Sequence, residues 1–198
     1  MQQVPVSLNG YLAVLGAADE TRAASIESGS IVKAERPVYC EVSISKLEEL
    51  DAVKQSGCFA KIRTGGVKAE AIPSPSAVAA FINACAERRL PFKATAGLHH
   101  PIRAEHPLTY EPGAPRAMMH GFLNVLMASA FAWHGRTDIE PIIAETDPLS
   151  FLFDEQAHWR NQALSTDQIR QARHHFMHSV GSCSFEEPVH DLQKLGLL

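Results

Sequence analysis

Two runs of the sequence, FAKIRT and PFKATAG, carry lysines in a setting where an amine can do chemistry. Each run is predicted to be a buried β-strand, in which side chains alternate between the two faces of a sheet. The face covered by helices must be apolar, so Lys61 and Arg63 are expected to point to the opposite face, together with Lys93 and Thr95. An amine and a guanidinium that share one face can bind an anion, and a deprotonated amine is also a nucleophile.

A third run, VYCEVS, brings a carboxylate to the same place, because its alternation puts Glu41 on the face of the lysines. Parallel strands end at one edge of a sheet, which is where α/β folds bind their ligands. Burying an unpaired charge costs several kcal/mol, so the cluster persists only if its charges pair or bind something. Two interpretations stay open: an ion-pair network of Glu41 with Lys61 or Arg63, and a site for a small anionic molecule.

Other candidate residues lie where the strands end, in the loop that follows, and on later elements. Glycines at strand ends let backbone N–H groups approach a phosphate or carboxylate, and histidines supply a general acid or base. An amide on an apolar helix face needs a polar partner, which a ligand site could provide. The catalytic candidates are Lys61, Lys93, Glu41, His99 and His100, and the substrate-binding candidates are Arg63, Thr64, Gly65, Gly66, Thr95, Gly97, His120, Asn124 and Glu145.

No metal centre and no cofactor is predicted. The adjacent pair His99 and His100 fits no standard spacing of metal ligands. His174 and His178 are spaced as i and i+4 on a predicted helix, but the HExxH context of a zinc site is missing. We expect this second pair to lie on a solvated helix face.

The elements that position these residues alternate between short β-like runs and capped helices, which is typical of βα units around a parallel sheet. Strands are expected at residues 38–43, 59–64, 91–97 and 139–145. Gly57 is expected to end the first helix. Helix starts are expected at a capping box, Ser45-Lys46-Leu47-Glu48, at Ser74-Pro75, near Arg116 for a helix that runs to Trp133, at Thr146-Asp147-Pro148, and at Ser165 with Gln168.

Four βα units are half of a closed eight-stranded barrel, which takes about 250 residues. The sequence therefore predicts an α/β fold of the (β/α)-barrel type with parallel strands, incomplete or a half barrel, in residues 37–198. A barrel completed by the N-terminal segment and a shortened relative of a longer protein are the alternatives. Residues 1–36 are expected to be helical or irregular, with a helix at 10–26. The loop at 98–115 is longer than a usual connection and is expected to be functional or to cover a ligand.

The composition predicts one globular domain and argues against nucleic acid and membranes as partners. Of 198 residues, 45% are hydrophobic and 20% are charged, and a net charge of −4 has the wrong sign for binding nucleic acid. The longest apolar stretch, residues 121–133, is shorter than the roughly 20 residues of a membrane span, and no secretory or transit signal is visible. We expect a cytoplasmic protein with four reduced cysteines and no membrane partner. The edges of an unfinished sheet predict a homo-oligomer.

The runs AKIRTGG and PFKATAGLHHP resemble a signature of uncharacterised bacterial (β/α)-barrel proteins, and the tail GSCSFEEPVHDLQKLGLL resembles the same set. Residues 60–101 are also locally similar to the class I deoxyribose-phosphate aldolases, whose late strands carry two lysines in motifs of the type VKTSTG and VKASGG. This resemblance implies that Lys61 is the Schiff-base lysine and that Lys93 is the second lysine, which favours its deprotonation. The chain departs from the pattern at Arg63, where the aldolases have a small residue, and at the two histidines that follow the second motif.

The leading hypothesis is an enzyme that acts on a small phosphorylated or carboxylated substrate, as a Schiff-base lyase of the aldolase kind. In this hypothesis Lys61 is the nucleophile, Glu41 or a histidine moves protons, and Arg63 holds the anion with the backbone of Gly65 and Gly66. A non-covalent transferase of the phosphoribosyltransferase type is the second hypothesis. The third is a non-catalytic half barrel that pairs with another chain.

Overall fold

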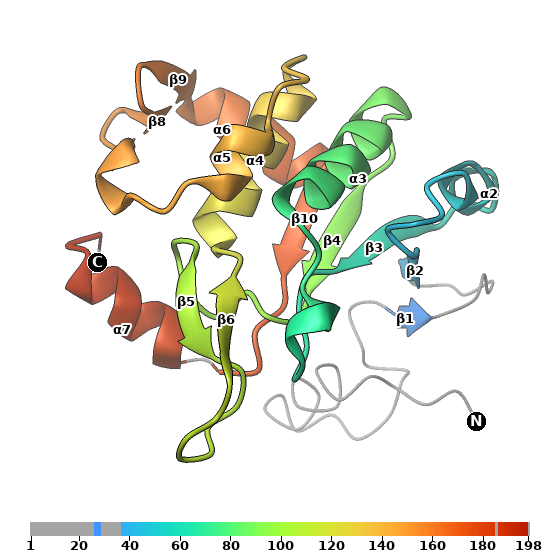
Figure 1. Cartoon of the computed structure of the whole chain (residues 1–198). Helices are drawn as coiled ribbons and strands as arrows, with labels where there is room; N and C mark the ends of the chain where they lie inside the picture. The colour runs from blue at the N-terminus through green and yellow to red at the C-terminus, as the bar shows by residue number, and fades with distance from the viewer. Residues whose placement is uncertain (1–25, 29–36, 185, 198) are drawn as a thin grey trace, which may run out of the picture.

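The fold is mixed α/β, built on a sheet of five parallel strands in the order β1-β2-β3-β4-β10 (Figure 1). The computed structural model describes residues 26–28, 37–184 and 186–197, so nearly all of the helix predicted at 10–26 lies outside the described residues. Within them the sheet is open and does not close into a barrel. The strands are β1 (Ile26–Ser28), β2 (Val38–Glu41), β3 (Phe59–Arg63), β4 (Phe92–Thr95) and β10 (Met177–Val180).

The three strands predicted around Lys61 are confirmed as β2, β3 and β4, and their register fixes which side chains are neighbours. Glu41 pairs with Lys61, and Lys61 pairs with Lys93, so the three residues form one row across the sheet. Arg63 pairs with Thr95 two residues further along the strands. Paired residues in adjacent strands point to the same face, so the common face predicted for these side chains is confirmed.

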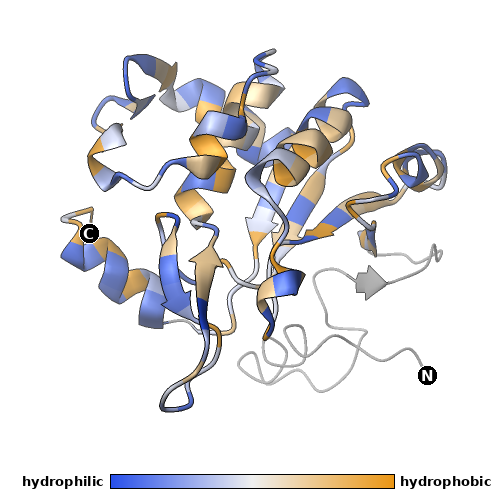
Figure 2. Cartoon of the chain, in the orientation of Figure 1, coloured by the Kyte–Doolittle hydropathy of each residue, from blue (hydrophilic) through white to orange (hydrophobic). Residues whose placement is uncertain are grey.

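Helices cover the other face of the sheet, and apolar residues of the strands and of these helices form the core. Figure 2 shows hydrophobic positions along both the strands and the helices. Phe92 of β4 contacts Phe81 of the covering helix α3 and also Phe176, with ring centroids 5.4 and 5.0 Å apart. This leaves the charged row on the face opposite the helices. The α-helices are α2 (Glu49–Gln55), α3 (Pro75–Glu87), α4 (Phe122–Trp133), α5 (Glu140–Ala144), α6 (Thr166–His175) and α7 (Glu186–Lys194), with 3₁₀ turns η2 (Ala69–Ala71) and η3 (Pro148–Ser150).

Several predicted helix ends are confirmed. The Ser74 side chain accepts a hydrogen bond from Ala77 N and Pro75 opens α3, while Ser165 and Gln168 form the capping box of α6. Gly57 follows α2 in the left-handed conformation, with φ of +70°. The turn η3 begins where Thr146-Asp147-Pro148 predicted a helical segment.

The capping box predicted at Ser45 is wrong. Helix α2 begins at Glu49 and has no side-chain cap, and the Ser45 hydroxyl lies 2.9 Å from the Ser43 hydroxyl. Serine side chains readily form hydrogen bonds to nearby groups in turns. Here the Ser45 hydroxyl contacts Ser43 and does not cap the helix. The chain makes two turns, at Ser43–Lys46 and at Lys46–Glu49, before the helix continues.

The strand predicted at 139–145 is also wrong, since this segment forms helix α5. Ile139, Ile142 and Ile143 are completely buried, and their spacing of i, i+3 and i+4 is that of a helix face. The last strand of the sheet is instead β10, which follows α6 directly. His178 therefore belongs to a strand, not to the solvated helix face predicted for it with His174.

Two small antiparallel sheets complete the described structure. Strands β5 (Ala104–Pro107) and β6 (Arg116–Met119) form a hairpin that occupies most of the predicted long loop, so the helix predicted from Arg116 begins only at Phe122. The other small sheet contains β7 (Phe151–Phe153), β8 (Gln156–Trp159) and β9 (Gln162–Ser165).

Two glycines allow the carboxyl ends of β3 and β4 to touch. A Cβ atom on Gly65 would lie 2.8 Å from the Cα atom of Gly97, and one on Gly97 would lie 3.0 Å from the Cα atom of Gly65. Backbone atoms cannot move out of such a contact as a flexible side chain can. Close packing of two strand ends therefore accounts for both glycines, whether or not an anion binds there.

We predict that Gly65→Ala lowers the free energy of unfolding by about 1–3 kcal/mol, because the added methyl group forces β3 and β4 apart. Urea unfolding measures the loss. Gly113→Ala is the control, since Gly113 has φ of +77° but no atom within 4 Å of an added Cβ, and its cost is the left-handed strain of about 1 kcal/mol. Equal stability of Gly65→Ala and the wild type would contradict the packing explanation.

Candidate functional site

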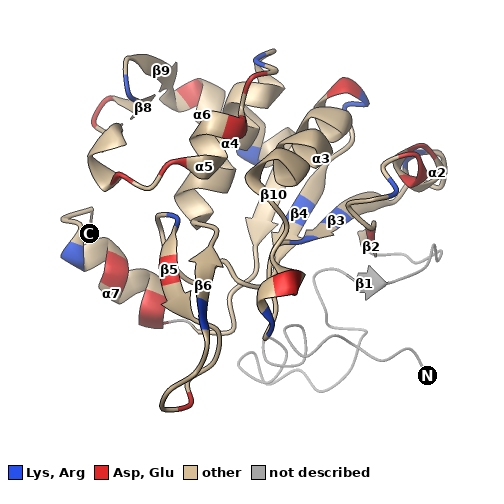
Figure 3. Cartoon of the chain, in the orientation of Figure 1, with Lys and Arg blue, Asp and Glu red and all other residues tan. Residues whose placement is uncertain are grey.

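The row of charged residues contains a direct ion pair. Lys61 Nζ lies 2.8 Å from Glu41 Oε2, and the whole Lys61 residue is only 6% exposed. Lys93, its neighbour in register on β4, is 9% exposed. Figure 3 shows basic positions on both β3 and β4. The ion-pair network considered from the sequence is thus observed between Glu41 and Lys61. The pair brings the Lys61 amine into direct contact with a carboxylate.

Aromatic rings form the amino-terminal part of the same face. The Lys93 Nζ atom lies 4.8 Å from the centroid of the Tyr39 ring, which is a cation–π contact. The Tyr39 hydroxyl lies 2.6 Å from His178 Nδ1, and the His178 ring meets Phe59 edge-on with centroids 5.1 Å apart. Burial lowers the pKa of His178 below its ordinary value, which favours the neutral ring at neutral pH.

A cavity of about 580 Å³ lies at the carboxyl ends of β2 and β3. Glu41 lines it and so belongs both to the ion pair and to the cavity wall, and Arg63 lines it from the last position of β3. Lys61 and Lys93 are not among the lining residues, so Lys61 is connected to the cavity through Glu41. The position of the cavity is the usual ligand position of a parallel sheet. The lining residues are Glu41, Val42, Ser43, Ile44, Lys46, Glu49, Ile62, Arg63, Glu70, Ala71 and Pro73.

Sequence reasoning missed His178 and Glu70 as neighbours of the charged row and the cavity. His178 follows Met177, which occupies the register position of Phe92 on the apolar face, so alternation along β10 would have predicted its side. The strand itself was not predicted. Glu70 lies in a 3₁₀ turn between β3 and α3, where no periodicity indicates the direction of a side chain.

The threonines predicted to bind substrate join the two strand ends. The Thr64 hydroxyl donates to the carbonyl oxygen of Ala96 over 2.7 Å, and Thr64 N donates to the carbonyl oxygen of Thr95. Ala96 has φ of +64°, a conformation that costs a non-glycine residue about 1–2 kcal/mol. The bond from Thr64 holds this strained turn, so both threonines serve the backbone and not the cavity.

Asn124 finds its polar partners within the fold. Its side-chain oxygen accepts a hydrogen bond from Arg103 N at 2.9 Å, and its amide nitrogen donates to the carbonyl oxygens of Ile142 and Glu145 at 2.9 and 2.8 Å. The residue is fully buried. It therefore ties the loop before β5 to the end of α5, which accounts for a polar residue in this apolar helix.

Glu145 and His120 are also bound within the fold. Glu145 Oε2 accepts hydrogen bonds from the Arg160 guanidinium at 2.8 and 2.9 Å, and Oε1 accepts from two backbone N–H groups. Burial acts to raise the pKa of the Glu145 carboxyl, but these hydrogen bonds outweigh it, so the pKa is lowered. His120 Nε2 donates to the carbonyl oxygen of Pro73 at 2.8 Å, and burial lowers the pKa of His120. The structure places neither residue on the cavity wall.

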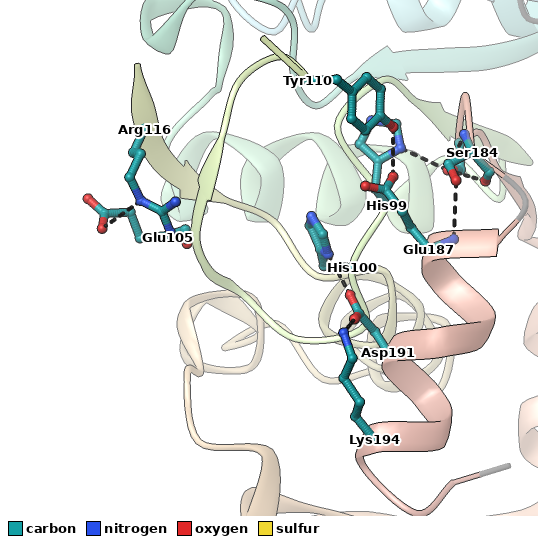
Figure 4. A network of polar contacts seen from close by, with 10 residues as sticks. His99, His100, Glu105, Tyr110, Arg116, Ser184, Glu187, Asp191 and Lys194 are labelled. Carbon is teal, nitrogen blue, oxygen red and sulfur yellow. Dashed lines mark hydrogen bonds and ion pairs between the residues drawn. The ribbon is translucent and has the colours of Figure 1, made fainter. Parts of the chain in front are cut away.

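His99 and His100 contact the C-terminal segment (Figure 4). His99 Nδ1 lies 2.8 Å from the Ser182 hydroxyl, and His100 Nδ1 lies 2.6 Å from Asp191 Oδ2 on helix α7. The His100 ring also stacks on His106 of β5, with centroids 3.4 Å apart. His100 thus joins α7 to the hairpin, His99 contacts the segment before α7, and neither histidine lines the cavity beside Glu41.

No protein-family model, curated protein or solved structure matches this chain. In the described ranges no three His, Cys, Asp or Glu side chains are arranged to hold a metal ion. None of the described helices combines the length and the apolar content that a membrane crossing demands. The site must therefore be interpreted from its own geometry.

We predict that Asn124→Ala lowers the free energy of unfolding by about 3–5 kcal/mol, because three backbone groups, two of them in buried bonds, lose their partner and a cavity is left. Asn83→Ala is the matched control, since Asn83 makes one bond, to the Thr137 carbonyl oxygen, near the surface, and its loss costs less than about 1 kcal/mol. Urea unfolding of both variants makes the comparison. Equal losses would contradict a structural role for Asn124.

Protonation of His106 is predicted to weaken the fold in mild acid. Burial, followed by the charge of His100, lowers its pKa from 6.5 to about 4. The unfolded imidazole takes up a proton at a higher pH than the folded one, so stability falls as the pH falls from 6.5 towards 4. Urea unfolding at pH 7 and pH 5 should show a smaller decrease in the free energy of unfolding for His106→Gln than for the wild type. His190→Gln, which changes an exposed histidine on α7, should keep the wild-type decrease; equal behaviour of the two variants would oppose this account.

Proposed function

We propose that this protein is an enzyme that binds a small carbonyl compound with an anionic group and acts on it through Lys61 as a Schiff-base lyase. We also propose that its open parallel sheet is a half barrel of the (β/α) type. The observation that carries the proposal is the ion pair of Lys61 with Glu41, because Glu41 also lines the cavity at the strand ends.

Glu41 gives the amine a route for its proton. Lys61 Nζ transfers one proton to the Glu41 carboxylate, and the free amine then attacks the carbonyl carbon of the substrate to form a carbinolamine. The protonated Glu41 returns its proton to the hydroxyl group, which leaves as water, and an iminium ion remains on Lys61. The iminium accepts the electron pair of the carbon–carbon bond that a lyase breaks.

Arg63 and Lys93 have supporting roles in this proposal. The exposed guanidinium of Arg63 on the cavity wall can form two parallel hydrogen bonds with a carboxylate or phosphate. Lys93 lies beside Lys61 in register and rests on the Tyr39 ring. In this proposal Lys93 places a second cation beside the Lys61 amine, and like charges in that position repel each other.

The second candidate function is a non-catalytic half barrel that pairs with another copy of the chain. The direct Glu41–Lys61 contact favours it, since a buried ion pair can serve only to neutralise its two charges. The sheet ends at β1 and β10 in the described structure, and such edges can pair with another chain. In this case a homo-oligomer forms and no carbonyl compound reacts.

We predict that borohydride traps a small aldehyde or keto acid on Lys61, because reduction converts the imine into a stable secondary amine. Peptide mass mapping locates the adduct. Glu41→Gln should slow trapping by about 100-fold, the contribution of one general acid–base group, and Lys61→Arg should abolish it. Thermal unfolding checks that both variants remain folded, because either change disrupts a buried ion pair.

Lys54→Arg is the matched control, since Lys54 is an exposed lysine on α2 that bonds to the Arg88 carbonyl oxygen. It should be trapped like the wild type. Labelling spread evenly over the exposed lysines, with Lys61 unmodified, would sink the Schiff-base proposal. If sedimentation then shows a dimer, the second candidate function is favoured.

A further inference from the structure

The cavity wall carries charges of both signs. Glu41, Glu49 and Glu70 supply three carboxylates, and Lys46 and Arg63 supply two cations. An anion held only by cations would fit poorly here, because the carboxylates outnumber the cations on the wall. A ligand that fits this wall therefore has to match charges of both signs.

Two of the carboxylates are already neutralised. Glu49 Oε1 lies 3.3 Å from Lys46 Nζ, and Glu41 Oε2 lies 2.8 Å from Lys61 Nζ. Arg63 and Glu70 remain, and neither has an ion-pair partner in the part of the chain that the structure describes. Among the described residues, one cation and one anion of the cavity wall thus lack an ion-pair partner.

The segment that carries Glu70 is anchored to the rest of the site. A Cβ atom on Gly66 would lie 2.8 Å from the Ala71 Cβ, so the chain of η2 packs tightly on the end of β3. Two residues later, the Pro73 carbonyl oxygen accepts the hydrogen bond of the buried His120. These contacts fix the backbone on both sides of Glu70 relative to Arg63.

Apolar residues also contribute to the cavity wall. Val42 and Ile62 are buried there, and Ile44, Ala71 and Pro73 add further apolar surface. The volume of about 580 Å³ is within the range of small-molecule sites. A ligand with a short hydrocarbon part and an ionised group at each end matches this wall.

We propose that the cavity binds a dipolar small molecule, with its carboxylate or phosphate on Arg63 and its ammonium group on Glu70. This inference rests on the proposed function only in taking the cavity as the substrate site. It adds that the carbonyl substrate carries an amine as well as an anionic group. Electrostatic complementarity at both ends then selects the ligand against molecules with one charge.

Isothermal titration calorimetry with four probes tests the proposal: 4-aminobutyrate, butyrate, butylammonium and inorganic phosphate. The dipolar probe should bind at least tenfold more tightly than each of the other three. Arg63→Gln and Glu70→Gln should each remove this preference, and both residues are exposed, so the fold should tolerate the changes. Lys68→Gln and Glu48→Gln, which change exposed charges outside the cavity wall, are the controls and should keep the preference.

Binding of butyrate or phosphate as tightly as 4-aminobutyrate would overturn the inference. An unchanged preference in Glu70→Gln would also overturn it, as would the absence of binding by the dipolar probe. Trapping of carbonyl compounds on Lys61 without binding of 4-aminobutyrate refutes the dipolar ligand alone. Binding of 4-aminobutyrate without any trapping refutes the Schiff-base chemistry alone and supports the dipolar site.

Discussion

The polar face of the sheet depends on the ion pair between Lys61 Nζ and Glu41 Oε2. Lys61 and Lys93 are direct neighbours on adjacent strands, and two like charges in that position repel each other. Each lysine therefore needs its own stabilising group, which is the Glu41 carboxylate for Lys61 and the Tyr39 ring for Lys93. Removal of Glu41 would leave a buried ammonium group without this carboxylate, at a cost of several kcal/mol.

The division of the sheet into an apolar and a polar face follows from the same constraint. Because the helices occupy one face, every charged residue of β2, β3 and β4 must lie on the other or at a strand end. Of these charged residues, Glu41 and Arg63 reach the carboxyl edge, where β2 and β3 enclose the cavity with the turn η2. The close contact of Gly65 with Gly97 holds β3 and β4 together at that edge.

Alternation along the strands predicted the row of Glu41, Lys61 and Lys93, because a period of two is a strong signal when one face is apolar. Short caps such as Ser74-Pro75 were predictable for a similar reason, since the signal is local. The segment at 139–145 was mispredicted because three isoleucines are compatible with a strand and a helix, and only packing against α3 and α4 decides between them. Strand β10 was missed because it has only four residues and one residue separates it from the end of α6, so its pattern resembles a continuation of the helix.

Several candidate site residues serve the fold, and the sequence could not distinguish these roles. A buried asparagine needs partners, but the sequence does not say whether a ligand or the backbone provides them. For Asn124 the partners are three backbone groups that lie up to 21 residues away. Glu70 is the reverse case, a residue that lines the cavity but was not predicted as a site residue. An exposed acidic residue in a turn has no sequence pattern that indicates such a position.

In the proposed mechanism, Lys61 exchanges its bond to Glu41 for a covalent bond to a ligand in the cavity. A crystal structure of protein treated with a small keto acid and borohydride tests this most directly. We expect continuous density from Lys61 Nζ into the cavity, with the carboxylate of the adduct beside Arg63. An unmodified Lys61 that still contacts Glu41, next to a cavity without ligand, would contradict the claim.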